Sequence, residues 1–266
     1  MSEIEVHDPT LIIRIGDDEV HIDMDLCVSA EARDAAIASR PFQNWKKAIA
    51  RDERLKVEYI FFQSIDMFEN RVGFIKFKSK TVVRATDELI PGIVFMRGNS
   101  VAVLVVLECE DDEYVLLVKQ PRVATGCFDF IEVVAGMLDG AGSFAGAAAK
   151  ELEEEAGIVI TEASLIDLTD EVGPKKPIYL SPGASDDAMR FFLEKRIVSR
   201  TELNALRGKL TGNRHEHEYL TLEILPLHEL RWIANAGTQI AYRFYLDYKR
   251  LLEKTAQSDE IENALG

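Results

Sequence analysis

The chain has few cysteines, little basic charge and no long apolar run, and each shortage excludes a class of protein. Its three cysteines, Cys27, Cys109 and Cys127, follow no CxxC or zinc-like spacing, so buried free thiols in a reducing compartment are expected rather than a disulfide framework. No apolar run approaches the roughly 18 residues that a membrane-spanning helix needs. The first residues, MSEIEVHDPT, resemble no signal or transit peptide, so a cytoplasmic location is the default expectation.

Positive charge is the scarcest property of the chain. Lysine and arginine number 31 against 46 aspartates and glutamates, which gives a formal net charge of −15. Non-specific binding to nucleic acid draws on clusters of basic residues, and the sequence holds no such cluster. An acidic protein that handles phosphate esters needs a divalent cation as an intermediary. We therefore expect neither a nucleic-acid nor a membrane partner, but a small-molecule substrate.

The first 92 residues indicate a smaller β-rich accessory domain. Residues 10–23 hold two apolar runs around Gly-Asp-Asp, a hairpin signal. Residues 31–52 have helical spacing interrupted at Pro41, and residues 56–83 are rich in strand-forming side chains. We expect the strands there to break at Glu69-Asn70 and at Gly73. The Pro91-Gly92 pair marks the expected domain boundary.

Residues 93–255 predict a second domain in which strands and helices mix. Five segments are expected to form strands before and after a central helix, and the first of them holds two strands. They cover residues 100–123, 128–137, 158–172, 190–199 and 219–226. A final helix is expected over residues 236–256, followed by a tail at 256–266. Mixed strands flanked by helices favour an α/β or α+β sandwich.

One predicted helix carries three neighbouring carboxylates. It begins after Ser143 and stops at Gly157. Helical spacing places an apolar stripe against the sheet, formed by Ala145, Ala148, Ala149, Leu152 and Ala156. Glu151, Glu154 and Glu155 share the adjacent stripe, where a hard divalent cation would relieve their repulsion. A glutamate run is also common on a solvated helix face with no function.

The pattern around this helix resembles the signature of the Nudix hydrolases. That signature is Gly, five residues, Glu, seven residues, then Arg-Glu-aliphatic-any-Glu-Glu-any-Gly-aliphatic. The chain matches it at Gly136, Glu151, Leu152, Glu154, Glu155, Gly157 and Ile158. Two positions depart from it: Gly142 stands where the family has its first Glu, and Lys150 replaces the Arg.

Further segments are similar to the ADP-sugar pyrophosphatase branch of that family, including its plant members. They are VKQPRVATGCFDFIEVVAGMLD, SPGASDD, FQSIDMFENRVGFIKFK and GKLTGNRHEHE. The resemblance implies a Nudix α/β/α sandwich with a mixed sheet, which cleaves ADP-ribose or ADP-glucose to AMP and a sugar phosphate. It implies Mg²⁺ as the cofactor, with Mn²⁺ as an alternative ion, and a homodimer that pairs through the N-terminal segment.

The resemblance also assigns residues to roles. The metal ligands are Glu151, Glu154, Glu155 and the backbone carbonyl of Ala135. Asp187 matches the position of a loop acid that activates water, with Asp186 beside it as a substitute. Arg122 matches a phosphate-binding arginine, because its planar fork holds two oxygens. Glu132, Met137 and Arg97 are expected to line the substrate site.

Three other interpretations stay open from the sequence. Gly142 and Lys150 favour a catalytically impaired protein that binds nucleotide sugars without turnover. Another nucleoside diphosphate derivative is a further candidate substrate. His215 and His217, in the run His-Glu-His-Glu, alternate as two ligands on one strand would, but no third nitrogen or sulfur ligand stands near them in sequence.

Overall fold

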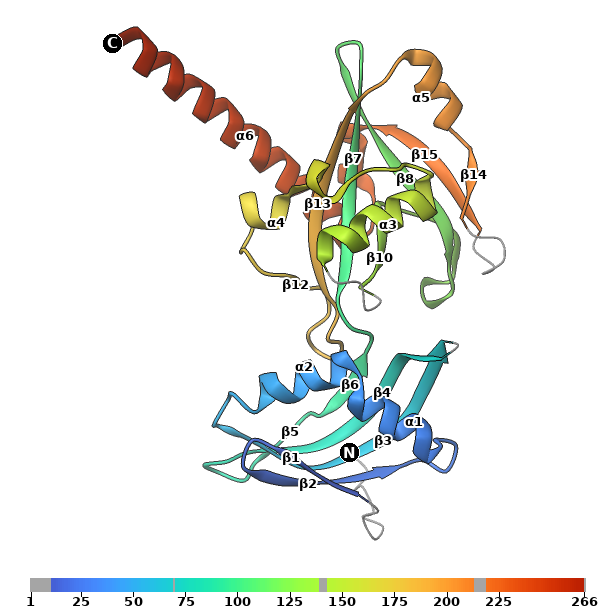
Figure 1. Cartoon of the computed structure of the whole chain (residues 1–266), viewed down its shortest axis with the longest axis vertical. Helices are drawn as coiled ribbons and strands as arrows, with labels where there is room; N and C mark the ends of the chain where they lie inside the picture. The colour runs from blue at the N-terminus through green and yellow to red at the C-terminus, as the bar shows by residue number, and fades with distance from the viewer. Residues whose placement is uncertain (1–10, 69, 139–142, 213–218, 266) are drawn as a thin grey trace. The chain divides into compact units, whose positions relative to one another are not determined.

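The computed structural model describes residues 11–68, 70–138, 143–212 and 219–265. The chain forms two compact units, Met1–Asn99 with Ser181–Asp187, and Ser100–Leu180 with Ala188–Gly266. The segment Ser181–Asp187 therefore joins the first unit although it lies within the sequence of the second. The predicted α/β sandwich with a mixed sheet, preceded by a smaller β-rich region, is confirmed (Figure 1).

The first unit is built on a six-stranded sheet in the order β1-β2-β3-β4-β5, with β6 paired to β4. Strands β2 and β3 are parallel, whereas β1–β2 and β3–β4 are antiparallel. Phe42, Phe62 and Phe77 pack together in its core. The elements are β1 (Leu11–Ile15), β2 (Asp18–Met24), α1 (Ala30–Ala38), α2 (Arg40–Ile49), β3 (Leu55–Phe68), β4 (Arg71–Val83), β5 (Leu89–Ile90) and β6 (Ile93–Met96).

Two local predictions for this unit have different outcomes. The predicted interruption of the helical run is present just before Pro41. Helix α1 ends at Ala38, Ser39 caps α2, and the proline lies in the first turn of α2. Gly73, however, does not break a strand: it lies inside β4. A Cβ atom at Gly73 would stand 2.7 Å from the ring of Phe68 on the neighbouring strand. The glycine makes room for that ring. It is also the extra residue at an irregularity of the β3–β4 pairing, because Asp66 pairs with Phe74 and Met67 pairs with Val72.

The second unit is a nine-stranded mixed sheet. Its main order is β11-β13-β7-β8-β15-β14, while β10 pairs with β7, β12 with β13 and β9 with β8. Strands β13 and β7 are parallel, and β7 and β8 form an antiparallel hairpin. The strands are β7 (Ser100–Cys109), β8 (Asp112–Arg122), β9 (Cys127–Glu132), β10 (Val134–Met137), β11 (Ile166–Asp167), β12 (Ile178–Tyr179), β13 (Ala188–Ile197), β14 (Leu210–Thr211) and β15 (Leu220–Pro226).

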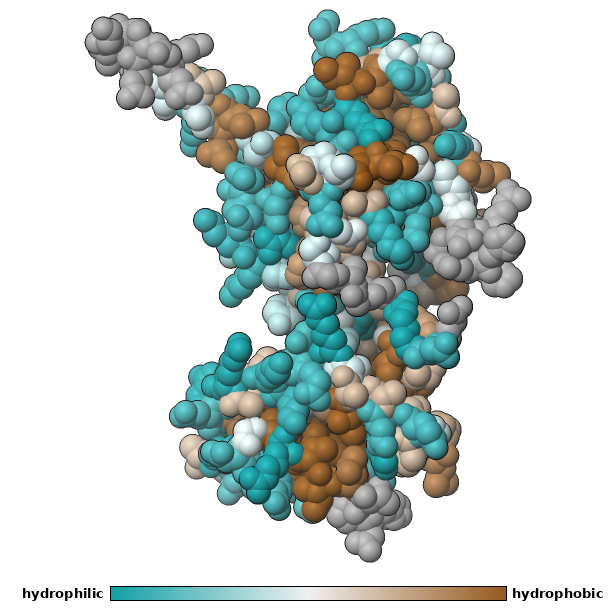
Figure 2. All heavy atoms as spheres, in the orientation of Figure 1, coloured by the Kyte–Doolittle hydropathy of each residue, from teal (hydrophilic) through white to brown (hydrophobic). Residues whose placement is uncertain are grey.

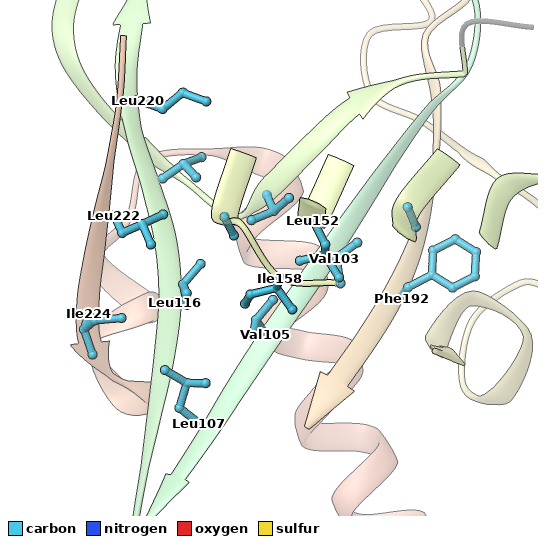
Figure 3. Packing of buried hydrophobic residues seen from close by; sticks show 14 of the residues in the cluster. Val103, Val105, Leu107, Leu116, Leu152, Ile158, Phe192, Leu220, Leu222 and Ile224 are labelled. Carbon is cyan, nitrogen blue, oxygen red and sulfur yellow. The ribbon is translucent and has the colours of Figure 1, made fainter. Parts of the chain in front are cut away.

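Helices cover both faces of this sheet, and the alternation of side chains along β7 supplies a core to each. Val103 and Val105 pack with Leu152 of α3, as Figure 3 shows, whereas Leu104 packs with Tyr245 of α6 on the opposite face. The helices and helical turns are η1 (Val123–Thr125), α3 (Phe144–Ala156), η2 (Glu162–Ser164), α4 (Leu168–Glu171), α5 (Arg200–Leu206), η4 (Leu227–Trp232) and α6 (Ala236–Leu265).

Two predictions about the second unit and one about the cysteines of the whole chain need correction. The run 158–172 was expected to be a strand, but it holds only the two-residue β11 between η2 and α4. Exposed Val159 explains part of the difference, because an apolar residue in the run does not face a core. The final helix continues to Leu265 instead of ending near residue 256. The three cysteines are free as predicted, but only Cys109 is buried, and Cys27 is exposed.

Among the described residues, no helix combines the length and the apolar composition that crossing a membrane requires.

Candidate functional site

Helix α3 carries the carboxylates, and its two ends are fixed as the sequence predicts. The Ser143 side chain accepts a hydrogen bond from the Gly146 amide at 2.9 Å and caps the first turn. Gly157 ends the helix with a left-handed backbone at φ 68°. The helix packs on the sheet through its small residues, although the stripe differs from the prediction: Ala147 is buried, whereas Ala145 and Ala149 are only partly buried.

The three glutamates of α3 that are predicted metal ligands differ in exposure, which their shared stripe did not predict. Glu155 is buried, with 8% of its surface exposed. Glu151 is half-buried and Glu154 is exposed. The Glu154 carboxylate pairs with the Lys150 ammonium at 3.2 Å, so the lysine that departs from the family pattern does contact one of the glutamates. An exposed pair of this kind contributes little to stability.

Glu155 is a strongly perturbed acid of the second unit. Its Oε2 atom accepts a hydrogen bond from the Ala135 amide at 3.3 Å. Burial, and to a smaller extent the negative charge of Glu151, raise the pKa of the Glu155 carboxyl to about 8. Glu132 acts in the same direction, whereas the Arg122 guanidinium lowers the pKa. A buried carboxyl beside a second acid is a place where a cation would be strongly favoured.

Gly136 allows Glu151 to approach the end of β10. A Cβ atom on Gly136 would lie 1.8 Å from the carboxyl carbon of Glu151. The glycine that opens the sequence motif is therefore needed because the Glu151 carboxylate occupies the space of its missing side chain. The backbone at Ala135–Gly136 and the carboxylates of Glu151 and Glu155 thus meet at one corner of the sheet.

The donors at this corner suit a hard divalent cation, which prefers oxygen ligands. They comprise two acidic side chains and a backbone segment that admits no side chain of its own. Within the described part of the chain, no three His, Cys, Asp or Glu side chains already converge as a closed metal site. Two protein carboxylates would leave further positions around Mg²⁺ for substrate or water, as is usual for this ion.

A second group of polar residues lies where β8, β9 and α6 meet. Arg122 donates from Nε to Oε1 of the buried Glu132 at 2.6 Å, and Gln120 donates to the same oxygen at 3.2 Å. Asn235 donates to Oε2 of Glu132 at 3.2 Å. These residues border a pocket of about 410 Å³, which is lined by Pro121, Arg122, Val123, Ala124, Thr125, Phe130, Glu132 and Asn235.

Asn235 and Gln120 are residues that the sequence analysis missed. The signal for Asn235 was present, because an asparagine directly before a helical pattern is a common N-cap. Nothing in the sequence, however, pairs it with Glu132, which is 103 positions away. Gln120 precedes Arg122 by two residues on β8. The pairing of β8 with β9 is irregular between these two residues, so strand alternation alone does not predict that both side chains reach the same Glu132 oxygen.

The structure groups the other predicted residues differently. Met137 ends β10, half-buried, and pairs with Ser100 across to β7. Arg97 and Asp187 both belong to the first unit, and their side chains pair at 3.5 Å. Their part in a site with the glutamates of the second unit stays a prediction.

Asp186 has a role that argues against it as a substitute for Asp187. Its carboxylate accepts the backbone amides of Arg97 and Gly98 at 2.8 and 3.1 Å. Burial raises the pKa of Asp186, and these two amides oppose that effect. The side chain therefore fixes the loop around residues 97–98.

Two further predictions concern residues outside the described part of the chain. They are the replacement at Gly142 and the possible ligand pair His215 and His217. The departure at Gly142 and the histidine pair therefore stay predictions.

Comparison with known proteins adds three findings. The family model for the NUDIX domain matches residues 97–248. The chain is 38% identical over 221 residues to Nudix hydrolase 14, chloroplastic, from Arabidopsis thaliana, across 80% of this chain and 71% of that protein. It also resembles the crystal structure of an ADP compounds hydrolase, with a TM-score of 0.50 and 14% identity, over 74% of this chain and 95% of that one. At this identity, the last likeness is one of fold alone.

Proposed function

This chain belongs to the Nudix hydrolase family, and we propose that it cleaves the diphosphate of ADP-sugars, ADP-ribose or ADP-glucose, to AMP and a sugar phosphate. The observation that carries the proposal is the corner where Gly136 admits the Glu151 carboxylate beside the buried Glu155. Nudix hydrolases generally use divalent metals, and the donors at this corner suit one.

Each predicted metal-binding or substrate-binding residue has a defined task in this proposal. Glu151, Glu155 and the Ala135 carbonyl would hold Mg²⁺, with Mn²⁺ as an alternative. The family resemblance adds Glu154, which is exposed and paired with Lys150. The bound ion supplies charge neutralisation at the diphosphate and a lower pKa for bound water. Arg122 binds a phosphate oxygen, and its side chain is 41% exposed beside the pocket. Met137, Glu132 and Arg97 are assigned to substrate binding by the family resemblance.

Asp187 is proposed as the residue that orients or deprotonates the attacking water. The support is the resemblance of the Ser-Pro-Gly loop to that of related enzymes. The Asp187 side chain is only 10% exposed, and its carboxylate pairs with the Arg97 guanidinium at 3.5 Å, which limits the orientations that the carboxylate can adopt.

The direct test is a substrate panel. Purified protein is incubated with ADP-ribose, ADP-glucose, NADH and a dinucleoside polyphosphate in Mg²⁺ or Mn²⁺, and AMP release is followed. Release from the ADP-sugars alone supports the proposal, and release from another substrate identifies a different diphosphate derivative. Binding of ADP-ribose without release supports the impaired-binder alternative, which the exposed Lys150–Glu154 pair favours over a braced site.

Within the same panel, Glu154→Gln is expected to reduce kcat/KM by less than about tenfold. The reason is that Glu154 is exposed and already paired with Lys150, so the metal corner keeps its two less exposed carboxylates. Glu153→Gln removes a charge from an exposed position of the same helix and serves as the matched control. A loss for Glu154→Gln as large as that for Glu155→Gln would show that the exposed carboxylate is drawn into the site.

A homodimer through the first unit is part of the proposal. Apolar side chains gather in a patch on the visible face of this unit (Figure 2). The ring centroids of Phe74 and Phe95 lie 5.3 Å apart. Ile93 and Phe95 occupy alternate positions of β6, and both side chains are exposed. Light scattering is expected to give the mass of two chains, and Ile93→Asp is expected to lower it. A monomeric wild-type protein at working concentration contradicts the dimer.

The cytoplasmic location stays a prediction. The name of the Arabidopsis relative assigns that protein to the chloroplast.

A further inference from the structure

The first turn of α6 is tied to the sheet through Asn235. Its Oδ1 atom accepts hydrogen bonds from the Thr238 amide at 2.7 Å and from the Thr238 hydroxyl at 3.0 Å. Because Oδ1 accepts from a backbone amide, the Asn235 amide nitrogen must face the other way, where it donates to Glu132 at 3.2 Å. One side chain therefore caps a helix and holds a buried carboxylate.

Glu132 depends on that contact because it is buried and charged. Only 7% of its surface is exposed. Arg122 and Gln120 donate to Oε1, and Asn235 donates to Oε2. A carboxylate with donors on both oxygens is held in one orientation. Arg122 contacts Oε1 of Glu132 with both Nε and a terminal nitrogen, each at 2.6 Å, so the orientation of Glu132 fixes the orientation of the Arg122 guanidinium.

Thr238 makes a second tie to the same region. Its hydroxyl is fully buried and accepts a hydrogen bond from the Val133 amide at 3.1 Å. Val133 lies between the end of β9 at Glu132 and the start of β10 at Val134, outside the strand ladders. This hydrogen bond fixes the backbone two residues before Ala135, where the chain reaches the corner formed with the Glu151 and Glu155 carboxylates.

We infer that Asn235 and Thr238 are positioning residues for the proposed hydrolysis: they hold Glu132 and the Val133 backbone so that Arg122 meets the substrate phosphate in a single orientation. This inference rests on the proposed function. Neither residue needs to touch the reacting atoms. The pocket beside Arg122 is bordered by Asn235 as well, so the support stands directly against the space that the substrate would enter.

Asn235→Asp separates the two tasks of the side chain. Aspartate caps a helix as well as asparagine does, so the bonds to Thr238 are retained. The group that faces Glu132, however, becomes an oxygen, which repels the buried carboxylate. At pH 8, KM for ADP-ribose is expected to rise about 10- to 100-fold, the usual scale for loss of a supporting partner, while kcat changes by less than about threefold.

Two further comparisons separate positioning from simple stability. Asn235→Ser keeps an acceptor for the cap but has no donor that reaches Glu132, so a smaller rise in KM is expected with an unchanged melting temperature. Thr238→Val is expected to lower kcat/KM, and Thr238→Ser, which keeps the hydroxyl, is expected to restore it. A role limited to capping predicts that Asn235→Asp and Asn235→Ser both match the wild type.

A readout on Arg122 itself distinguishes failure of this inference from failure of the proposed function. The Arg122 Nε–H signal in ¹H–¹⁵N NMR spectra is assigned by its absence in Arg122→Lys. It is expected to be sharp and slow to exchange in the wild type, but broadened in Asn235→Asp, whether or not the protein hydrolyses ADP-ribose. An unchanged signal in Asn235→Asp, or an active wild type whose KM the variant retains, overturns the inference. A wild type without AMP release contradicts the proposed function alone.

Discussion

Glu155→Gln is expected to reduce kcat about 10³-fold, a loss on the scale of the stabilisation that a bound metal gives, while making the metal-free protein more stable at pH 8 to 9. The two effects have one cause. Glu155 is buried beside Glu151, so its ionised form is disfavoured in the absence of a cation. Glutamine fills the same volume without a charge, and its amide oxygen can still accept from Ala135.

The pH dependence of this stability follows from the raised pKa of about 8 against 4.5 for the free carboxyl. Below pH 4.5 the group is protonated in the folded and unfolded states, and there is no penalty. As the pH rises from 4.5 to 8, the unfolded chain loses the proton that the folded chain retains, so folding becomes less favourable. Above pH 8 the whole penalty is present, on the order of 5 kcal/mol for the change from 4.5 to about 8.

Denaturant unfolding of the metal-free wild type and Glu155→Gln at several pH values measures this difference. The wild type is expected to lose stability between pH 5 and 8, whereas the variant has a flatter profile over that range. Mg²⁺ is expected to recover the stability of the wild type but not to act on the variant, because a ligand stabilises only the state that binds it. A variant less stable than the wild type at pH 9 would contradict the buried-charge argument.

Gly136→Ala is expected to lower kcat/KM about 100-fold, the scale of a misplacement of roughly 1 Å in an active site, with the fold intact. The added methyl group would stand 1.8 Å from the Glu151 carboxyl carbon, so that carboxylate must move. Gly136 does not have a positive φ, and an alanine backbone fits there. Because Glu151 is a flexible side chain, its displacement costs the fold only about 1 kcal/mol.

A double-mutant cycle tests this reasoning. In a Glu151→Ala background, the obstructing carboxylate is gone, so Gly136→Ala is expected to change neither stability nor residual activity further. Thermal unfolding and AMP release from ADP-ribose are measured for the four proteins. If Gly136→Ala keeps wild-type activity, Glu151 at that corner is not needed for turnover.

Helix α3 and its ends were predictable because capping and spacing are local. Ser143 and Gly157 carry their own signals, and the alanines between them favour a helix whatever surrounds it. The different burial of Glu154 and Glu155 was not predictable from spacing alone. It depends on where β10 ends against the helix, which is set by the packing of the sheet.

Contacts between distant segments were the other limit. The hydrogen bond between Asn235 and Glu132 joins residues 103 positions apart in the sequence, and the contact of Asp186 with Arg97 joins residues 89 positions apart. No periodicity encodes such pairs. Gly73 depends on a tertiary contact in the same way. A glycine in a strand usually suggests a break, and the Phe68 ring that occupies the space of its missing side chain is visible only in the structure.

Strand β7 has no side that is free to vary. From Ser100 to Leu107 every residue is buried, since odd positions supply one helical layer and even positions supply the other. In β4, by contrast, buried and accessible residues largely alternate. Substitutions would therefore be tolerated at every second position along β4. In β7, most substitutions would disturb one of the two cores, so the packing beneath Glu155 and beneath Asn235 would change slowly.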